Sequence, residues 1–113
     1  MKKIEAKIRK SKFKEVKKNL IKDGFDSFNY HLTRCISKKS EQRFYRGVEF
    51  DSKSLDRIDF TIYVNNNDVD KVLDIIKESG ITGDAYDSLI MVFGVERSYV
   101  LRHVDGKDKL IQN

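Results

Sequence analysis

Twice along this chain, a stretch of alternating apolar and polar residues is followed by an apolar stripe at helical spacing. Residues 2–9 and 58–64 are the alternating stretches, and each is typical of a strand with one buried face. A helix that follows each strand must bury its apolar stripe against another element. The repeat therefore favours two helices packed on one side of a sheet.

The two predicted helices have recognisable ends. Ser11 is a candidate N-cap of the first helix, and Gly24 suits the position just past its last turn. The pattern of the second helix stops near Gly80. The apolar stripes comprise Phe13, Val16, Leu20 and Ile21 in the first helix and Val69, Val72, Leu73 and Ile76 in the second.

Three further stretches complete the predicted sheet. Residues 25–36 alternate, residues 89–95 are apolar, and residues 98–104 suggest a short final strand or edge before a polar tail. The order is β-α-β-loop-β-α-β with an extra C-terminal strand. It predicts an α+β fold of the ferredoxin-like βαββαβ type, with two helices on one face of an antiparallel sheet. A length of 113 residues predicts a single domain, residues 1–113.

The sheet face away from the helices is expected to be polar but crossed by Ile90 and Val92. Such a face is either solvated or packed against copies of itself in an oligomer. Its other expected members are Lys3, Glu5, Lys7, Asn29, His31, Thr33, Asp59, Thr61 and Tyr63.

Residues 37–55 are polar and charged and follow neither the helical nor the strand period. A loop this long in a compact domain is commonly functional. Phe44 and Tyr45 are aromatic anchors of the kind that dominate interfaces, and Arg46 and Glu49 offer charged contacts. We therefore expect this loop, between the second and third strands, to carry partner contacts.

Basic residues gather at the N-terminal end of the chain. Residues 1–22 contain ten of the 23 Lys and Arg residues, opposed by Glu5 and Glu15. Such a surface attracts phosphates, nucleic acid or acidic lipid, or is simply a solvated helix face. Apart from Phe13 on the apolar stripe, no aromatic residue is interleaved with these lysines, which argues against a platform for stacked bases.

The sequence lacks a recognisable signal peptide. Its longest apolar run, Leu89 to Phe93, is far shorter than the ~20 residues that a membrane span requires. Cys35 is the single cysteine, so a disulfide framework is excluded and a small strand residue is the expected role. We expect a cytoplasmic protein without direct membrane insertion.

Catalytic residues are not arranged in a recognisable pattern. His31 and His103 lie far apart in the sequence, without a carboxylate or a second Cys at ligand spacing. Asp84 and Asp87 suit turn and cap roles better than an acid pair. The chain is therefore predicted not to be an enzyme and to hold no metal. A small enzyme acting through Asp84, Asp87 and His103 is a remote alternative.

Residues 45–50, Tyr-Arg-Gly-Val-Glu-Phe, resemble the T-loop signature Tyr-Arg-Gly-Ala-Glu-Tyr of the PII nitrogen-regulatory proteins. Residues 1–9 resemble the first strand of that family and residues 12–16 its first helix, so the resemblance spans nearly the whole chain. It identifies residues 37–55 as the T-loop and residues 81–88 as the B-loop of a PII-like domain.

The resemblance implies a homotrimer of ferredoxin-like subunits that signals and does not catalyse turnover. Members of the family bind ATP or ADP in clefts between subunits, often with 2-oxoglutarate and Mg²⁺. Their T-loops dock on partners such as membrane transporters or enzymes of nitrogen metabolism. The ligand favours one loop conformation, and the partner binds that conformation.

Some T-loop positions depart from the family pattern. Phe50 replaces the Tyr that many members uridylylate, so this modification has no hydroxyl to act on. Lys39 replaces the Gln that helps to hold Mg²⁺ and 2-oxoglutarate, and Cys35 and Ser37 replace glycines at the base of the loop. The departures argue against Mg²⁺ and 2-oxoglutarate as ligands and leave ADP, ATP or AMP as the expected ones.

The phosphate-binding positions are altered as well. Tyr86 and Ser88 replace glycines of the B-loop, Leu89 replaces a phosphate-pairing Lys, and Val100 replaces one of two C-terminal arginines. Arg102 keeps the other. Each lost charge-assisted hydrogen bond is worth about 1.5–3 kcal/mol, so weaker or altered nucleotide binding is expected.

Together these observations predict a divergent PII-like regulatory trimer that senses an adenine nucleotide or a related anionic metabolite. The predicted ligand contacts are Asn29, Ser37, Lys38, Lys39, Tyr63, Thr82, Gly83, Asp87 and Arg102. The predicted partner contacts are Arg43, Phe44, Tyr45, Arg46, Glu49 and Phe50.

The alternative is a basic ferredoxin-like domain that binds RNA on its open sheet face. Against it, no strand carries the aromatic pattern of an RNA-recognition motif, and the basic cluster follows the first strand and first helix. The primary hypothesis includes no nucleic-acid partner.

Overall fold

The computed structural model describes residues 1–36, 43–45, 48–50, 54–80 and 88–112, and the backbone alone for residues 35–36, 43–45, 48–50 and 54–55. In chain order its elements are β1 (Lys2–Arg9), α1 (Lys10–Lys22), β2 (Asn29–Ile36), β3 (Arg43–Tyr45), β4 (Val48–Phe50), β5 (Ser54–Val64), a 3₁₀ turn η1 (Asn66–Asp68), α2 (Val69–Gly80), β6 (Leu89–Gly94), β7 (Tyr99–Val104) and β8 (Lys107–Gln112).

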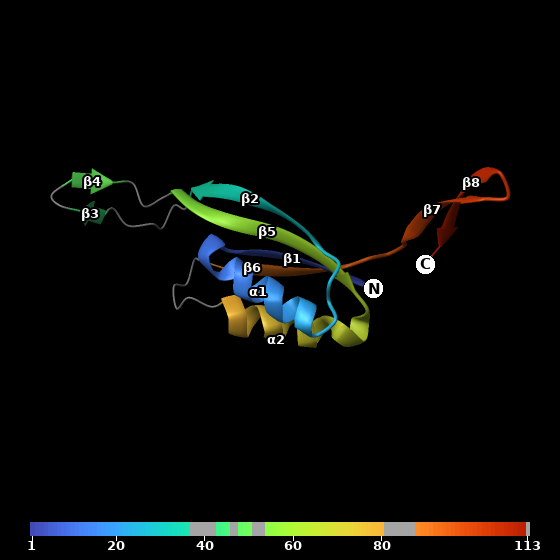
Figure 1. Cartoon of the computed structure of the whole chain (residues 1–113), viewed down its shortest axis with the longest axis horizontal. Coiled ribbons are helices and arrows are strands. Elements are labelled where there is room, and N and C mark those ends of the chain that lie inside the picture. Colours follow the sequence, from blue (N-terminus) through green and yellow to red (C-terminus); the bar gives the residue numbers. More distant parts are fainter. Residues whose placement is uncertain (37–42, 46–47, 51–53, 81–87, 113) are drawn as a thin grey trace.

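The main sheet has the strand order β2-β5-β1-β6, and every neighbouring pair is antiparallel. Helices α1 and α2 lie side by side and cover one face of this sheet, whereas the other face is open (Figure 1). The predicted ferredoxin-like α+β fold is confirmed. The alternating strands determine the layers, because every second side chain of β1 and β5 points toward the helices.

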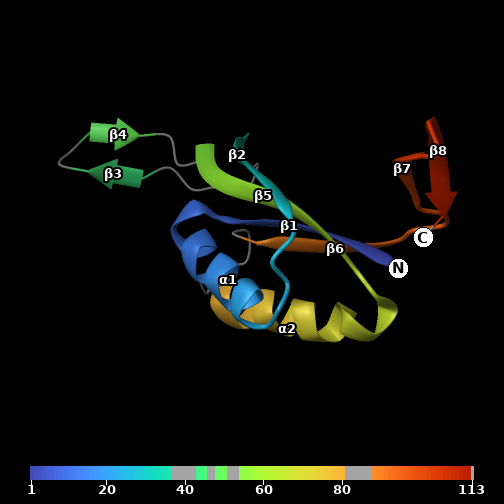
Figure 2. The ribbon, with the colours of Figure 1, turned by 45° about the vertical axis from the view of Figure 1, so that its right-hand side comes forward.

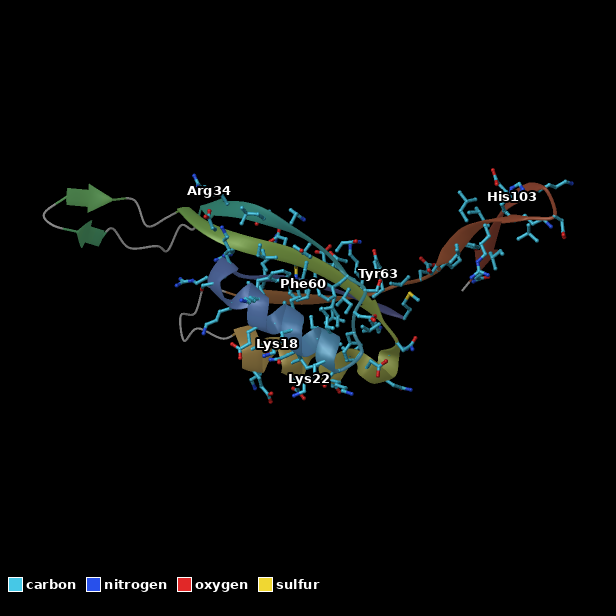
Figure 3. The ribbon with its side chains drawn as sticks, viewed as in Figure 1. Lys18, Lys22, Arg34, Phe60, Tyr63 and His103 are labelled. Atoms are coloured by element: carbon cyan, nitrogen blue, oxygen red, sulfur yellow. The ribbon has the colours of Figure 1, made fainter. Side chains whose placement is uncertain are left out.

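The core lies between the helices and the sheet. Ile4, Ala6 and Ile8 of β1 are buried there, opposite the buried face of β5. Phe60 of β5 sits at its centre, with its ring centroid 6.1 Å from that of Phe13 and 6.0 Å from that of Phe28 (Figure 3). These contacts fill the space between the two layers with aromatic rings in tilted arrangements.

Helix α1 ends as predicted but does not begin as predicted. Gly24 has φ +90°, its N–H donates to the Ile21 carbonyl at 3.0 Å, and the Phe25 N–H donates to the Leu20 carbonyl at 2.9 Å. This pair of bonds is the Schellman motif, which requires a left-handed residue. At the other end Arg9 occupies the N-cap without a side-chain cap, so the Ser11 prediction is wrong.

The two helices touch closely at one end. Gly80, the last residue of α2, is buried, and a Cβ atom there would lie 3.4 Å from Val16 Cγ2. Nearby, the Asn19 amide donates to the Ser79 hydroxyl at 2.6 Å. A Cβ atom at Gly80 would therefore make ordinary van der Waals contact with α1 and β1.

The face of β6 differs from the prediction. Val92 pairs with Ile4 and Ile90 pairs with Ala6, so both side chains lie on the helix-facing side. The side chains of β6 on the open face are Leu89, Met91 and Phe93. Residues 89–93 are all apolar, and such a run carries no period that assigns a face. The second strand also starts later than predicted, at Asn29.

Residues 37–55 are not a loop throughout. The short strands β3 and β4 pair there, with Phe44 opposite Glu49 and Tyr45 opposite Val48. The pair lies beyond one end of the main sheet (Figure 1). The prediction of a segment without strands is therefore wrong for these residues, because three-residue strands are too short to show alternation.

The C-terminal residues form a separate hairpin, β7–β8, at the other end of the molecule (Figure 2). Asp105 and Gly106 join its strands with φ of 53° and 76°. Two positive φ angles in a row are typical of a type I′ turn, for which Asp-Gly is a favoured sequence. The extra C-terminal strand is confirmed as β7, and the polar tail that follows it forms its partner, β8.

The two hairpins give the subunit an extended outline, 69 Å along its longest axis. The radius of gyration is 18.2 Å. A compact chain of this length has about 13 Å. The subunit therefore exposes more surface than a compact domain of its size.

Candidate functional site

Three of the predicted ligand residues, Asn29, Tyr63 and Arg102, lie among the described residues. Asn29 pairs with Thr61 across β2 and β5, and Tyr63 follows two residues later on the same face. They are therefore diagonal neighbours, about 7–8 Å apart at their backbones. Both side chains are exposed on the open face. The other six, Ser37, Lys38, Lys39, Thr82, Gly83 and Asp87, lie outside the described residues.

Arg102 is separated from the other two. It lies on β7, opposite Lys109 of β8, in the hairpin that projects beyond the end of the sheet near Tyr63 (Figure 3). The structure thus brings Asn29 and Tyr63 together but leaves Arg102 on another part of the subunit.

A network of polar side chains crosses the open face beside these residues. Asp59 accepts from Lys7 Nζ at 2.9 Å and from the Thr33 hydroxyl at 3.2 Å, and His31 Nε2 lies 3.9 Å from the same carboxylate. Sequence reasoning placed all four on this face but did not connect them. The strand register, which sets Lys7 and His31 opposite Asp59, is the information that was missing.

A second ion pair lies next to Tyr63. Lys3 is opposite Tyr63 in the register, and its Nζ is 2.8 Å from Glu5 Oε1. The hydrogen bond to Glu5 raises the pKa of Lys3 above its ordinary value. Lys3 and Lys7 each have a carboxylate partner, which reduces the positive charge that this face offers to RNA phosphates. The alternative of RNA binding on the open face is weakened accordingly.

Large apolar side chains are exposed on the same face. Leu89 and Phe93 of β6 are exposed, and Lys3 Nζ lies 5.5 Å from the ring centroid of Phe93 in a cation–π contact. Tyr63 is 54% exposed on the neighbouring part of the face. Polar groups that already have partners, mixed with uncovered apolar groups, are typical of a surface that meets another protein surface.

Two leucines are paired and exposed on one side of the hairpin. Leu101 and Leu110 face each other across β7 and β8 and are 68% and 69% exposed. Tyr99 lies on the same side, and His103 Nδ1 is 2.9 Å from Asp108 Oδ1 farther along it. Sequence reasoning missed the two leucines, although the Asp105-Gly106 pair flanked by alternating residues was a usable hairpin signal.

The predicted partner contacts lie on β3 and β4 where they are described. Arg43, Phe44 and Tyr45 form β3, whereas Glu49 and Phe50 belong to β4. Arg46 lies outside the described residues. The backbone pairing sets Arg43 opposite Phe50, so residues from both ends of the predicted motif are neighbours in a hairpin.

The remaining alternatives receive little support from geometry. Asp84 and Asp87 lie outside the described residues, and His103 pairs with Asp108 on the hairpin. Within the described part of the chain, no group of three or more His, Cys, Asp or Glu residues is placed to hold a metal ion. Among the same residues, no helix has the length and apolar character needed to span a membrane.

Comparisons with known proteins identify a family that the chain resembles over most of its length. The profile of the family described as "Nitrogen regulatory protein P-II" matches residues 1–105. The chain is 31% identical over 106 residues to the protein of that name from Pyropia yezoensis, covering 93% of this chain and 95% of the relative. It is 34% identical over 103 residues to the one from Nostoc punctiforme, covering 90% and 92%. Strand β8 follows the matched residues.

Proposed function

Because this chain belongs to the nitrogen regulatory protein P-II family and is therefore a signal-transduction regulator, we propose that it acts as a non-catalytic homotrimer. In this proposal the trimer senses an adenine nucleotide or a related anionic metabolite between its subunits, in the cytoplasm. The β3–β4 segment and its flanking residues then regulate a partner protein, such as a membrane transporter or a metabolic enzyme.

Two uncovered surfaces support the trimer. The open sheet face exposes Leu89, Phe93 and Tyr63, and the hairpin exposes Leu101 and Leu110. A two-stranded hairpin is marginally stable in water unless it packs against something. A neighbouring copy supplies cover for both surfaces, and a ring in which each subunit contacts the next leaves neither exposed.

The chemistry of the three described ligand residues fits a nucleotide. Tyr63 offers an exposed aromatic ring to a base, the Asn29 amide both donates and accepts hydrogen bonds, and the Arg102 guanidinium suits a phosphate. Arg102 lies on the projecting hairpin, whereas Asn29 and Tyr63 lie on the sheet. This separation is the observation that carries the proposal, because it supports a site formed by the sheet of one subunit and the hairpin of its neighbour.

Signalling follows from that boundary. A ligand held by the sheet of one subunit and the hairpin of the next favours whichever arrangement of the neighbouring loops allows both contacts. The partner then binds β3–β4 in that arrangement, and linkage requires that partner binding strengthens ligand binding by the same factor. Neither Mg²⁺ nor 2-oxoglutarate is part of the proposal, because Lys39 stands where the family has the Gln that contacts them.

Isothermal titration with ATP, ADP, AMP and cyclic nucleotides tests the sensor. We expect at least one of them to bind, and Arg102→Gln to weaken that binding about ten- to a hundredfold through loss of a charge-assisted hydrogen bond. Lys109→Gln is the matched control, because Lys109 lies opposite Arg102 and carries the same charge. Absence of binding at millimolar nucleotide would reject the sensor and leave an interaction scaffold.

A further inference from the structure

The outer side of α1 carries a row of lysines. Lys10, Lys14, Lys18 and Lys22 are all exposed and recur every four residues, so they stay within about a third of the helix circumference over ~18 Å. Figure 3 places Lys18 and Lys22 on the helix layer, on the other side of the core residue Phe60 from the open sheet face. We call these four lysines, together with Ile21, the lysine face.

The charge of the lysine face is specific to α1. The neighbouring helix α2 also has an exposed side, but there Asp70, Asp74 and Glu78 alternate with Lys71 and Lys77. The two helices cover the same sheet (Figure 1). The exposed charges of α2 are mixed, as general solubility requires, whereas Glu15 is the only acidic residue among the lysines of α1. The exposed charge of α1 is therefore predominantly positive.

The lysines of this face are available to a partner. Among the residues that the structure describes, no carboxylate lies within ion-pair distance of Lys10, Lys14, Lys18 or Lys22. By contrast, the partly buried Lys17 has its Nζ 5.8 Å above the Tyr30 ring. Uncompensated positive charge along a straight row attracts a surface of regularly spaced negative charge.

Ile21 indicates which kind of anionic surface fits. It is 46% exposed and, by its helical position, lies between Lys10 and Lys14 on the circumference. A nucleic-acid backbone offers nothing to an aliphatic side chain. A membrane interface accepts lysines among the headgroups and an aliphatic side chain at the boundary of the acyl region.

The shape of the subunit permits such contact. Both hairpins, β3–β4 and β7–β8, extend from the sheet side of the molecule, and the helix layer forms the opposite side in both views (Figures 1 and 2). A flat surface therefore reaches the helices without meeting either hairpin. The sheet face and the hairpins stay free for the contacts assigned to them above.

We propose that the lysine face docks reversibly on anionic phospholipid headgroups, with Ile21 at the boundary of the apolar layer. The contact is peripheral, and it does not depend on nucleotide binding or on the trimer. It would hold the β3–β4 end of the regulator near a membrane surface without inserting the chain.

Co-sedimentation of the full chain with vesicles tests this. We expect binding to vesicles of phosphatidylcholine mixed with phosphatidylserine, weaker binding at higher salt, and little binding to phosphatidylcholine alone. Removing both Lys14 and Lys18 as Lys14→Gln and Lys18→Gln should weaken binding about thirtyfold, since each lysine near such a surface contributes about fivefold. The matched control is Lys71→Gln with Lys77→Gln on α2, which should bind as the wild type does.

Ile21→Gln separates lipid from other anionic partners, because it leaves the charge unchanged. We expect it to weaken vesicle binding about three- to tenfold and to leave the weak attraction to polyuridylic acid unaltered. Equal binding to neutral and anionic vesicles, or an equal loss in the α2 control, would overturn the proposal. Tighter binding to polyuridylic acid than to vesicles, with Ile21→Gln without effect on either, would assign the face to RNA instead.

Discussion

The two exposed leucines of the hairpin give the sharpest test of assembly. Leu101 and Leu110 pair across β7 and β8, and each is about two-thirds exposed in the isolated subunit. If a neighbouring copy covers them, replacing both by Thr should weaken the trimer. Thr is β-branched and has a high strand propensity, so the hairpin itself should be preserved.

The size of the effect follows from the exposed area. Full burial of a Leu side chain stabilises by about 1.5–3 kcal/mol, and with two-thirds still to be covered about 1–2 kcal/mol per residue is at stake. Two residues in each of three subunits amount to about 6–12 kcal/mol per trimer. The midpoint concentration varies as the square root of the constant for dissociation of the trimer into three monomers, so it should rise about 10²- to 10⁴-fold.

Sedimentation velocity over a dilution series measures that midpoint directly. Ile21→Gln is the control, because it removes an exposed aliphatic residue from the helix layer on the other side of the sheet. Circular dichroism should be the same for all three proteins. A wild-type chain that stays monomeric at every concentration, or a double variant with an unchanged midpoint, would refute the assignment of the hairpin to a subunit contact.

Two further predictions concern the fold. Phe60→Ala should lower the free energy of unfolding, measured by urea titration, by about 3–5 kcal/mol, because Phe60 is buried between Phe13 and Phe28. A loss below about 1 kcal/mol would mean that the aromatic cluster is not the centre of the core. Gly24→Ala should lower the same free energy by about 1 kcal/mol or more, because Gly24 has φ +90°, a backbone angle that Ala adopts only with strain although a Cβ would meet no neighbouring atom. An unchanged unfolding midpoint would show that the Schellman turn is not maintained in solution.

Where one layer covers one face, periodicity was sufficient to predict the structure. The alternation in β1 reflects a single buried side, and so do Phe13, Val16 and Leu20 of the α1 stripe, whereas Ile21, also assigned to that stripe, is exposed. Gly24 ended the helix for a reason visible in its residue type. The Ser11 prediction failed because β1 ends at Arg9 and α1 begins at Lys10, so Arg9 itself occupies the N-cap position and Ser11 lies inside the helix. The capping preference of Ser was outweighed there by the geometry of the strand–helix junction.

The wrong predictions share a physical cause: the contacts that determine these structures join residues that are not neighbours in the sequence. Residues 89–93 are uniformly apolar, and only pairing with β1 shows that Ile90 and Val92 face the helices. Strands β3 and β4 are recognised only because they pair with each other, since neither is long enough to show an alternating sequence pattern. At the candidate site, Asn29 and Tyr63 become neighbours through the register of β2 and β5, whereas Arg102 lies on β7 in the separate hairpin.

The positions of Met1 and of the end of β8 bear on how this protein is best attached to a surface. The Val95 N–H donates to the Met1 carbonyl at 3.2 Å, which ties the start of the chain to the segment between β6 and the hairpin. Both ends of the described chain lie at the side opposite β3–β4 (Figure 1). A biotin or a chip linkage placed at Met1 therefore leaves β3–β4, the proposed partner contact, pointing into solution, whereas one placed beside β8 crowds the hairpin proposed to contact a second copy.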